Sequence, residues 1–300
     1  MNHAGIQTRS AGPLQPGPGV ATLWQLRTRT LTFGRRPLLM GIINVTPDSF
    51  SDGGQCVTAE AAIERGRSLA AEGADLLDIG GESTRPYSAV VPVEEELHRV
   101  LPVVEQLARE ISLPLSIDTS KAAVARAALD RGVEIVNDVT GLTGDAEMLP
   151  LVAAAGCGVC AMHMRGTPQT MQDDPKYDDV VAEVAAYLRT RRDALIAAGV
   201  AAERICLDPG IGFGKTHEHN RLLLANCYQF HALACPLLVG HSRKGFIGKL
   251  IGDQHADRTA GTLGAACALA RQQVQIVRVH DVAAVRQALV LFEAGGGLDR

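Results

Sequence analysis

Residues 113–141, LPLSIDTSKAAVARAALDRGVEIVNDVTG, contain one complete strand–helix–strand unit. Two short apolar runs end abruptly in polar residues, the first at Asp118 and the second at Asn137, and an Ala-rich stretch over 121–131 lies between them. Runs that are apolar on both faces are typical of parallel strands covered by helices on both sides. The unit therefore predicts two parallel strands joined by a helix.

The same pattern occurs eight times along the chain. The apolar runs are PLLMGIINVT, ADLLDIGGEST, LPLSIDTSK, VEIVNDVTG, CGVCAMHMRG, RICLDPGIGFG, CPLLVGHSRKG and VQIVRVHD. Helices are expected over 59–72, 93–110, 121–131, 146–155, 179–198, 218–230, 258–271 and 281–293. Eight such units predict an α/β protein with a single closed (β/α)₈ TIM barrel. A Rossmann sheet is disfavoured because the first strand leads into NVTPDSFSDGG and not into GxGxxG.

The N-terminal region differs from this repeat. Residues 1–20 are rich in Gly and Pro and predict a flexible tail. Residues 21–36, ATLWQLRTRTLTFGRR, alternate apolar and polar residues, which predicts a small antiparallel hairpin or lid at the start of a barrel domain over 21–300. Without an apolar signal core or a window of ~20 apolar residues, we expect a cytoplasmic protein with no membrane partner.

The composition is that of a globular protein. Of the 300 residues, 46% are hydrophobic and 21% are charged, and the net charge is -4, so no nucleic-acid partner is expected. The seven cysteines are scattered. Cys157 and Cys160 have CxxC spacing within a predicted strand, where residues three apart face opposite sides. We therefore expect buried, reduced thiols and neither a zinc site nor a disulfide.

Polar side chains end all eight predicted strands. In a (β/α)₈ barrel these ends and the loops after them build the active site. The mixture of acids, amides and cations is more than strand termination requires, and it predicts a functional pocket. The residues are Asn44, Asp78, Glu82, Asp118, Asn137, Asp138, His163, Asp208, Ser242, Lys244, Arg278 and His280.

Their chemistry suggests two kinds of ligand group. Asp118, Asn137 and Asp208 would suit a flat heterocycle with adjacent N–H and amino donors, because a carboxylate accepts such a pair in bidentate fashion. Bonds to backbone groups at the barrel end are the alternative. Arg278 and His280 lie two apart on one strand and face the same side. With Arg243 and Lys244 they predict a phosphate site, although Arg278 could instead form a structural ion pair.

Three loops add candidates. NVTPDSFSDGG predicts a lid that excludes water, with a solvated surface loop as the alternative, and its Asn44 offers an oxygen to Mg²⁺. GESTRP places Arg85 where it can meet a carboxylate. GIGFGKT does not fit the P-loop pattern. His163 is interpreted equally well as a site residue or as a core histidine.

Together these motifs resemble the dihydropteroate synthase family of folate biosynthesis. The matching segments, from about residue 37 to 293, are MGIINVTPDSFSDGG, DIGGESTRP, SIDTSK, NDVTG, MHMRGTPQTMQ, LDPGIGFGK, VGHSRKGFIG and IVRVHDV. The resemblance implies a transferase that joins 6-hydroxymethyl-7,8-dihydropterin diphosphate to 4-aminobenzoate with Mg²⁺, giving 7,8-dihydropteroate and diphosphate. It also implies a homodimer.

The resemblance assigns roles by motif match. It implies pterin contacts at Asp118, Asn137, Asp208 and Lys244; diphosphate contacts at Asn44, Arg278 and His280, with Asn44 also at the metal; aminobenzoate surroundings at Thr84, Arg85, Pro86, Phe213 and Ser242; and a closing loop with Phe50 and Asp52. Catalysis would rest on Asp118, Asp208, Lys244 and Arg278. His241 receives no role.

Three other functions fit the sequence less well. A Schiff-base lyase would use Lys244, but the sequence shows no apolar pocket that would depress the pKa of this lysine. A methyltetrahydrofolate-binding methyltransferase module would share the barrel and the carboxylates, but would need neither the Arg278–His280 pair nor the NVTPDSFSDGG loop. A purely structural protein would leave the polar strand ends unexplained.

Overall fold

The computed structural model describes residues 17–46 and 58–299. Its strands are β1 (Leu23–Gln25), β2 (Thr30–Thr32), β3 (Leu38–Asn44), β4 (Leu76–Gly80), β5 (Leu115–Asp118), β6 (Ile135–Asp138), β7 (Gly158–Met162), β8 (Ile205–Asp208), β9 (Leu238–Gly240) and β10 (Ile276–Val279). Its α-helices are α1 (Ala59–Glu72), α2 (Val93–Glu110), α3 (Ala122–Leu129), α4 (Met148–Ala155), α5 (Val180–Ala197), α6 (His217–Ala225), α7 (Gly245–Ile251), α8 (Thr259–Arg271) and α9 (Val282–Ala294). Two 3₁₀ helices, η1 (Ala202–Arg204) and η2 (Cys227–Leu233), complete the set.

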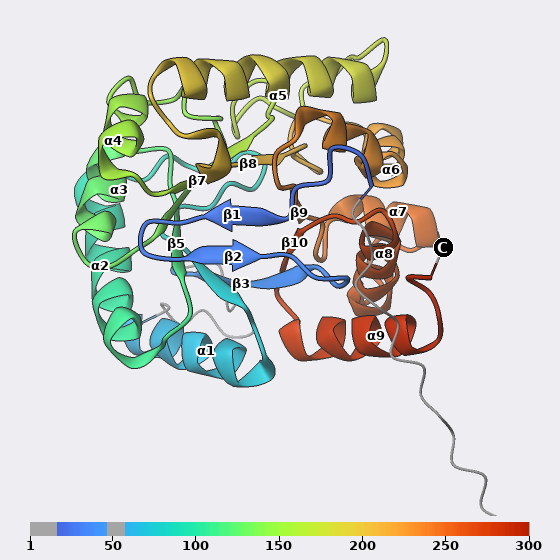
Figure 1. The fold of residues 1–300 in the computed structure, drawn as a ribbon, viewed down its shortest axis with the longest axis horizontal. Coiled ribbons are helices and arrows are strands. Elements are labelled where there is room, and N and C mark those ends of the chain that lie inside the picture. Colours follow the sequence, from blue (N-terminus) through green and yellow to red (C-terminus); the bar gives the residue numbers. More distant parts are fainter. Residues whose placement is uncertain (1–16, 47–57, 300) are drawn as a thin grey trace, which may run out of the picture.

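Strands β3 to β10 form a parallel barrel surrounded by helices (Figure 1). The strand order is β8-β7-β6-β5-β4-β3-β10-β9, and a parallel bridge between Leu207 and Leu237 joins the two ends of this row. The predicted (β/α)₈ barrel with a preceding hairpin is therefore confirmed.

Alternation along each strand decides which side chains reach the barrel interior. On β8, Cys206 belongs to the inner apolar cluster, whereas Ile205 and Leu207 belong to the outer core between strands and helices. Asp208 has the same parity as Cys206 and therefore faces inward. The same rule turns Asp78, Asp118, Asn137 and Arg278 inward on their own strands, which brings these polar groups together at the carboxyl end of the barrel.

The hairpin β1–β2 closes the opposite end. Trp24 and Leu26 are buried against the first inward residues of several strands, including Leu76 and Ile135. Nε1 of Trp24 donates to the carbonyl oxygen of Arg204 over 2.8 Å. Figure 1 shows the hairpin lying across this end of the barrel. The hairpin is thus a floor for the apolar interior and does not cover the polar mouth.

Helix boundaries mostly follow local signals. The side chain of Thr58 caps α1 by accepting from the amide of Ala61, and Gly73 ends this helix with a φ of 95°, a conformation that Gly adopts without strain. Two predictions about helices were wrong. The helix predicted over 218–230 breaks at Asn226, after which the chain continues as η2, and α7 was missed because its seven residues include two glycines.

The remaining expectations concern the tail and the surface. Gly17–Val20 form a turn closed by a 3.1 Å hydrogen bond, and the tail boundary stays a prediction.

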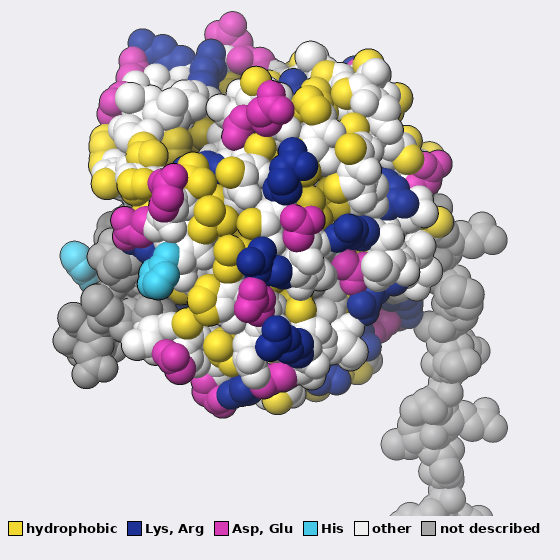
Figure 2. All heavy atoms as spheres, turned by 90° about the vertical axis from the view of Figure 1, so that its left-hand side faces the viewer, with side chains coloured by type: hydrophobic (Ala, Val, Ile, Leu, Met, Phe, Trp, Pro, Cys, Tyr) yellow, Lys and Arg dark blue, Asp and Glu magenta, His cyan; other side chains and the backbone are white. Residues whose placement is uncertain are grey.

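Cys157 lies in the outer core and Cys160 in the inner cluster, so the two thiols face opposite sides as expected. None of the helices in the described ranges is long and apolar enough to cross a membrane. On the face in Figure 2, basic and acidic side chains are interspersed.

Candidate active site

Arg278 is the centre of a buried polar network at the mouth of the barrel. Its Nε donates to Oδ2 of Asp78 over 2.6 Å, and its Nη2 donates to Oδ2 of Asp118 over 2.7 Å. Nδ2 of Asn137 donates to the same Asp78 oxygen over 3.1 Å. Asp78 is fully buried, so the guanidinium offsets a charge that would otherwise be costly. Burial by itself would lower the pKa of Arg278, but the charges of Asp78 and Asp118 outweigh this effect, so the pKa is raised and the guanidinium stays charged.

Asp208 and Lys244 face the same mouth from β8 and from the loop after β9. Oδ1 of Asp208 accepts from the amide of Gly210 over 2.7 Å. Nζ of Lys244 donates to the carbonyl oxygen of Ile211 and lies 4.5 Å from the centre of the Phe213 ring. The loop after β8 therefore connects both charged groups.

The expectation that Lys244 lacks a pocket that depresses its pKa was wrong. Burial lowers the pKa of Lys244 to about 8, although the charges of Asp208 and Asp118 oppose this shift. The cover comes from the loop after β8, where a Cβ on Gly212 would lie 2.8 Å from Cδ of Lys244. Sequence position alone places Lys244 in an exposed turn, and only the fold brings Phe213 and Gly212 over it.

The four predicted catalytic residues influence one another electrostatically. Burial raises the pKa of Asp118 to about 7, with the Arg278 charge opposing it and the Asp78 charge reinforcing it. Burial also raises the pKa of Asp208, against the charges of Lys244 and of Arg278. Asp118, Asp208, Lys244 and Arg278 thus converge on one mouth, as expected, while their individual roles stay predictions.

His280 and Ser242 form a second part of the mouth. Oγ of Ser242 lies 2.9 Å from Nδ1 of His280 and accepts from its backbone amide over 3.2 Å. Arg65 donates to the carbonyl oxygen of His280 over 2.5 Å. Burial, followed by the charges of Arg278 and Arg243, lowers the pKa of His280 to about 4. The imidazole is therefore neutral near pH 7.

Arg243 adds less positive charge to this corner than expected. It forms an ion pair with Asp281, in which Nε lies 2.9 Å from Oδ2, and its side chain is 52% exposed. With a φ of 57°, its backbone is in the left-handed region, which turns the side chain of Arg243 toward the loop after β10. The pair joins the loops after β9 and β10.

The loop after β4 carries Thr84, Arg85 and Pro86 at the rim. Thr84 is half-buried, whereas Arg85 and Pro86 are exposed. The charge of Arg85 also contributes to the lowered pKa of His280, which places Arg85 in the vicinity of this histidine. Lys121 anchors the base of this loop: its Nζ lies 2.6 Å from Oε2 of Glu82 and 2.6 Å from Oε2 of the fully buried Glu96.

Several sequence candidates lie elsewhere. Asp138 faces outward, where its Oδ1 accepts from the amide and hydroxyl of Thr140 over 2.7 and 2.8 Å, so its role is structural. His163 is a core histidine beside Lys215. Asn44, in contrast, ends β3 with inward parity and therefore belongs to the mouth. Phe50 and Asp52 lie outside the described residues.

Two buried charged residues near the mouth were not assigned a role from the sequence. Asp78 was recognised as a polar strand end but given no role, although its inward parity was readable from the strand pattern. Lys215 lies in the GIGFGKT segment, and because this segment does not fit the P-loop pattern, no role was predicted for Lys215. Its burial gave no sequence signal, because it depends on how the loop after β8 folds back.

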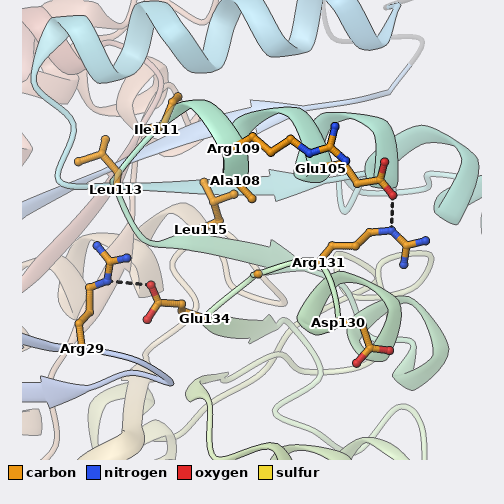
Figure 3. A pocket seen from close by; sticks show the side chains of 11 residues that line it. Arg29, Glu105, Ala108, Arg109, Ile111, Leu113, Leu115, Asp130, Arg131 and Glu134 are labelled. Atoms are coloured by element: carbon orange, nitrogen blue, oxygen red, sulfur yellow. Dashed lines mark hydrogen bonds and ion pairs between the residues drawn. The ribbon is translucent and has the colours of Figure 1, made fainter.

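The hollow in Figure 3 lies away from this mouth. It has a volume of about 430 Å³ and lies near the hairpin and the ends of α2 and α3. Arg29 and Glu134 form an ion pair of 2.8 Å there, and Arg131 and Glu105 one of 2.6 Å. Because these charges neutralise each other, the hollow has no excess charge that would select a ligand.

Comparison with known proteins identifies the family. A family model described as pterin binding enzyme matches residues 40–280. The dihydropteroate synthase of Escherichia coli (strain K12) is 46% identical over 258 residues, which cover 86% of this chain and 91% of the relative. The chain belongs to the dihydropteroate synthase family.

Solved structures of this family have the same fold. The Xanthomonas albilineans dihydropteroate synthase with 4-aminobenzoic acid has a TM-score of 0.84 and 47% identity, and covers 92% of this chain and 98% of its own. The same enzyme in complex with 7,8-dihydropteroate has a TM-score of 0.81 and 45% identity, covering 91% and 98%. The predicted family and enzyme class are confirmed, and the findings give no support to the methyltransferase alternative.

Proposed function

We propose that the mouth of this barrel joins 6-hydroxymethyl-7,8-dihydropterin diphosphate to 4-aminobenzoate. The observation that carries this proposal is the convergence of two carboxylates, Asp118 and Asp208, with two cations, Lys244 and Arg278, at the carboxyl end of the strands. Relatives with 4-aminobenzoic acid or 7,8-dihydropteroate support both substrate classes.

The carboxylates bind the pterin ring. The ring offers N–H and amino donors side by side, and Asp118, Asn137 and Asp208 provide acceptors from neighbouring inward positions. In the described residues, Oδ1 of Asp78 is buried without a hydrogen-bond partner, which adds unfilled acceptor capacity near this edge. In their ionised forms, Asp118 and Asp208 also favour positive charge that develops on the electron-rich ring.

Arg278 and His280 bind the diphosphate. As the bond between the pterin methylene carbon and the diphosphate oxygen breaks in an SN1-like step, negative charge grows on the leaving group and the Arg278 guanidinium stabilises it. If the Ser242 hydroxyl donates to Nδ1, neutral His280 carries its proton on Nε2 and can donate it in a hydrogen bond toward the oxygens.

Mg²⁺ fits this mouth as an ion shared with the substrate. No group of three or more acidic, histidine or cysteine side chains in the described ranges forms a metal cage. Mg²⁺ beside phosphates needs few protein ligands and keeps its waters, so the inward amide oxygen of Asn44 is an adequate donor. The ion would supply positive charge against the diphosphate.

The arylamine approaches from the rim. Thr84, Arg85 and Pro86 provide one side and Phe213 and Ser242 the other, with Arg85 positioned for the substrate carboxylate. The arylamine nitrogen attacks the methylene carbon and then loses a proton. Because arylammonium ions are strongly acidic, no buried general base is needed.

The test is diphosphate release from the dihydropterin diphosphate, with and without 4-aminobenzoate and with Mg²⁺ or EDTA. Release that rises with 4-aminobenzoate and yields 7,8-dihydropteroate supports the proposal. A lysine trapped by borohydride with a carbonyl substrate would instead indicate Schiff-base chemistry at Lys244, whose lowered pKa permits it.

We also infer a homodimer in the cytoplasm. The outer face of α8 exposes Ala260, Gly264 and Ala268 in one stripe, and the neighbouring α7 exposes Leu250 and Ile251, each by 52%. Such apolar exposure on a helix pair is typical of protein interfaces. Five of the six cysteines in the described ranges are buried, which is typical of thiols that pack as core residues in a cytoplasmic protein. Light scattering of the wild type and of Gly264→Arg tests the dimer, which this substitution should dissociate.

A further inference from the structure

The loop after β8 encloses a lysine that the proposed reaction does not use. Lys215 is 2% exposed, and its Nζ lies 2.9 Å from each of three atoms: Nδ1 of His163 and the carbonyl oxygens of Gly210 and Phe213. An ammonium has three protons to donate and no lone pair. The three neighbours therefore offer one acceptor to each proton of the ammonium form. Burial lowers the pKa of Lys215 well below its usual value, and the charge of Asp208 opposes this shift.

The backbone of this loop is shaped so that its carbonyl groups face two cations. Gly210, Gly212 and Gly214 have φ values of 67°, 90° and 62°, which Gly adopts without strain. Phosphate-binding loops point N–H groups at an anion. This Gly-rich loop does the opposite, because its carbonyl oxygens accept from Lys215 on one side and from Lys244 on the other.

Other loop groups are also fixed from outside the mouth. The carbonyl oxygen of Gly212 accepts from Nε2 of Gln172 over 3.1 Å, and that of Gly214 accepts from the Tyr177 hydroxyl over 2.8 Å. The amide of Gly212 donates to Oδ1 of Asn220 over 2.6 Å. Phe213 contacts both lysines, because its carbonyl oxygen accepts from Lys215 and its ring lies beside Lys244.

Among the three neighbours of Lys215 named above, His163 contributes a side chain and the other two contribute carbonyl oxygens. It is buried at the end of β7, and its ring packs edge-on against Tyr187 with the ring centres 4.7 Å apart. Burial and the nearby Lys215 charge lower the pKa of His163 to about 3, so the ring is neutral and Nδ1 can accept a hydrogen bond from Lys215. The network assigns the remaining ring proton to Nε2.

We propose that Lys215 and His163 are a positioning pair that holds the loop over 209–215 so that Phe213 forms one wall of the arylamine site. This inference rests on the proposed function, in which Phe213 borders 4-aminobenzoate. The pair acts from behind the loop and touches no reacting atom. Losing it should weaken arylamine binding more than pterin binding.

Substitutions of His163 distinguish the positioning role of the pair from the effect of the Lys215 charge on Asp208. Lys215 also supplies positive charge that favours ionised Asp208, so Lys215→Met disturbs the pterin site as well as the loop. His163→Leu removes the acceptor but keeps apolar packing, whereas His163→Asn keeps an acceptor near the position of Nδ1 and loses volume. A packing role therefore predicts that leucine is tolerated better, and a positioning role predicts the reverse.

The experiment measures KM for both substrates and kcat in the full-length enzyme. We expect His163→Leu to raise KM for 4-aminobenzoate about tenfold while KM for the pterin diphosphate changes less than about threefold. His163→Asn should stay within about threefold of the wild type for both substrates. Lys215→Met should raise both KM values. Lys176→Met is the control, because Lys176 is exposed and forms a surface ion pair with Asp174.

Two results would overturn the inference. The first is an unchanged KM for 4-aminobenzoate in folded His163→Leu, and the second is better function in the leucine variant than in the asparagine variant. If His163→Leu does not fold, Lys215→Met decides, because an unchanged KM for 4-aminobenzoate in folded Lys215→Met would also overturn the inference. Absence of 7,8-dihydropteroate synthesis by the wild type would instead refute the proposed function, so the two failures are distinguishable.

Discussion

Asp78 and Arg278 are joined by a 2.6 Å hydrogen bond between Oδ2 and Nε, although they lie 200 residues apart. Their strands, β4 and β10, are not neighbours, because β3 lies between them. The bond therefore crosses the inside of the barrel above β3 and connects the early and late parts of the chain. It also orients the guanidinium that we assign to the diphosphate.

Replacing Asp78 with Asn should destabilise the protein and reduce its activity. The change leaves Arg278 with one carboxylate and puts a donor beside the Asn137 amide, so the free energy of unfolding should fall by about 2–4 kcal/mol. Urea denaturation measures it. Asp193→Asn, in an exposed pair with Arg192, is the control and should change stability by less than about 0.5 kcal/mol. Equal changes in the free energy of unfolding in the two variants would contradict a stabilising role for Asp78 in the network.

Asp208→Asn should impair catalysis. An amide presents a donor where the carboxylate faces the donor edge of the pterin, and about 2–4 kcal/mol of transition-state binding should be lost. The expected fall in kcat/KM is therefore roughly 30- to 1000-fold. Circular dichroism checks that the variant is folded. An unchanged kcat/KM would exclude Asp208 from the pterin site.

Acid should destabilise the enzyme through its buried histidines. Burial lowers the pKa of His241 from 6.5 to about 4, so below pH 6.5 the unfolded state binds more protons and stability falls as pH falls toward 4. The loss attributable to His241 is at most about 3 kcal/mol. We expect a smaller drop in unfolding free energy between pH 7 and 4.5 for His241→Gln than for the wild type. The exposed His255→Gln is the control, and identical slopes in all three proteins would contradict the prediction.

Arg85→Ala should mainly raise KM for 4-aminobenzoate. Arg85 is exposed at the rim, so its removal should leave the fold and kcat nearly unchanged while the arylamine carboxylate loses its partner. Steady-state kinetics with each substrate varied in turn measures the effect. Arg189→Ala on the exposed surface of α5 is the control. A larger change in KM for the pterin diphosphate would place Arg85 at a different subsite.

Much of the barrel and the composition of its mouth could be predicted from local pattern. Apolar runs that end at Asp118, Asn137, Asp208 and Arg278 indicate strands, and their period of two assigns each polar end to the inside or the outside. The same rule could have separated inward Asp78 from outward Asp138. The breaks at Asn226 and before α7 were harder to predict, because such short segments depend on tertiary packing more than on propensity.

The sequence by itself determined the number of strand–helix units, their parallel order, and the end of the barrel at which polar residues gather, because these depend on alternation and on the order of elements along the chain. The tertiary structure alone decided that Lys244 is covered and has a lowered pKa, that Arg243 turns to Asp281, and that Lys215 is enclosed by carbonyl oxygens. Burial and pairing at these positions arise from loops that come together only when the barrel closes, and no local pattern records how those loops meet.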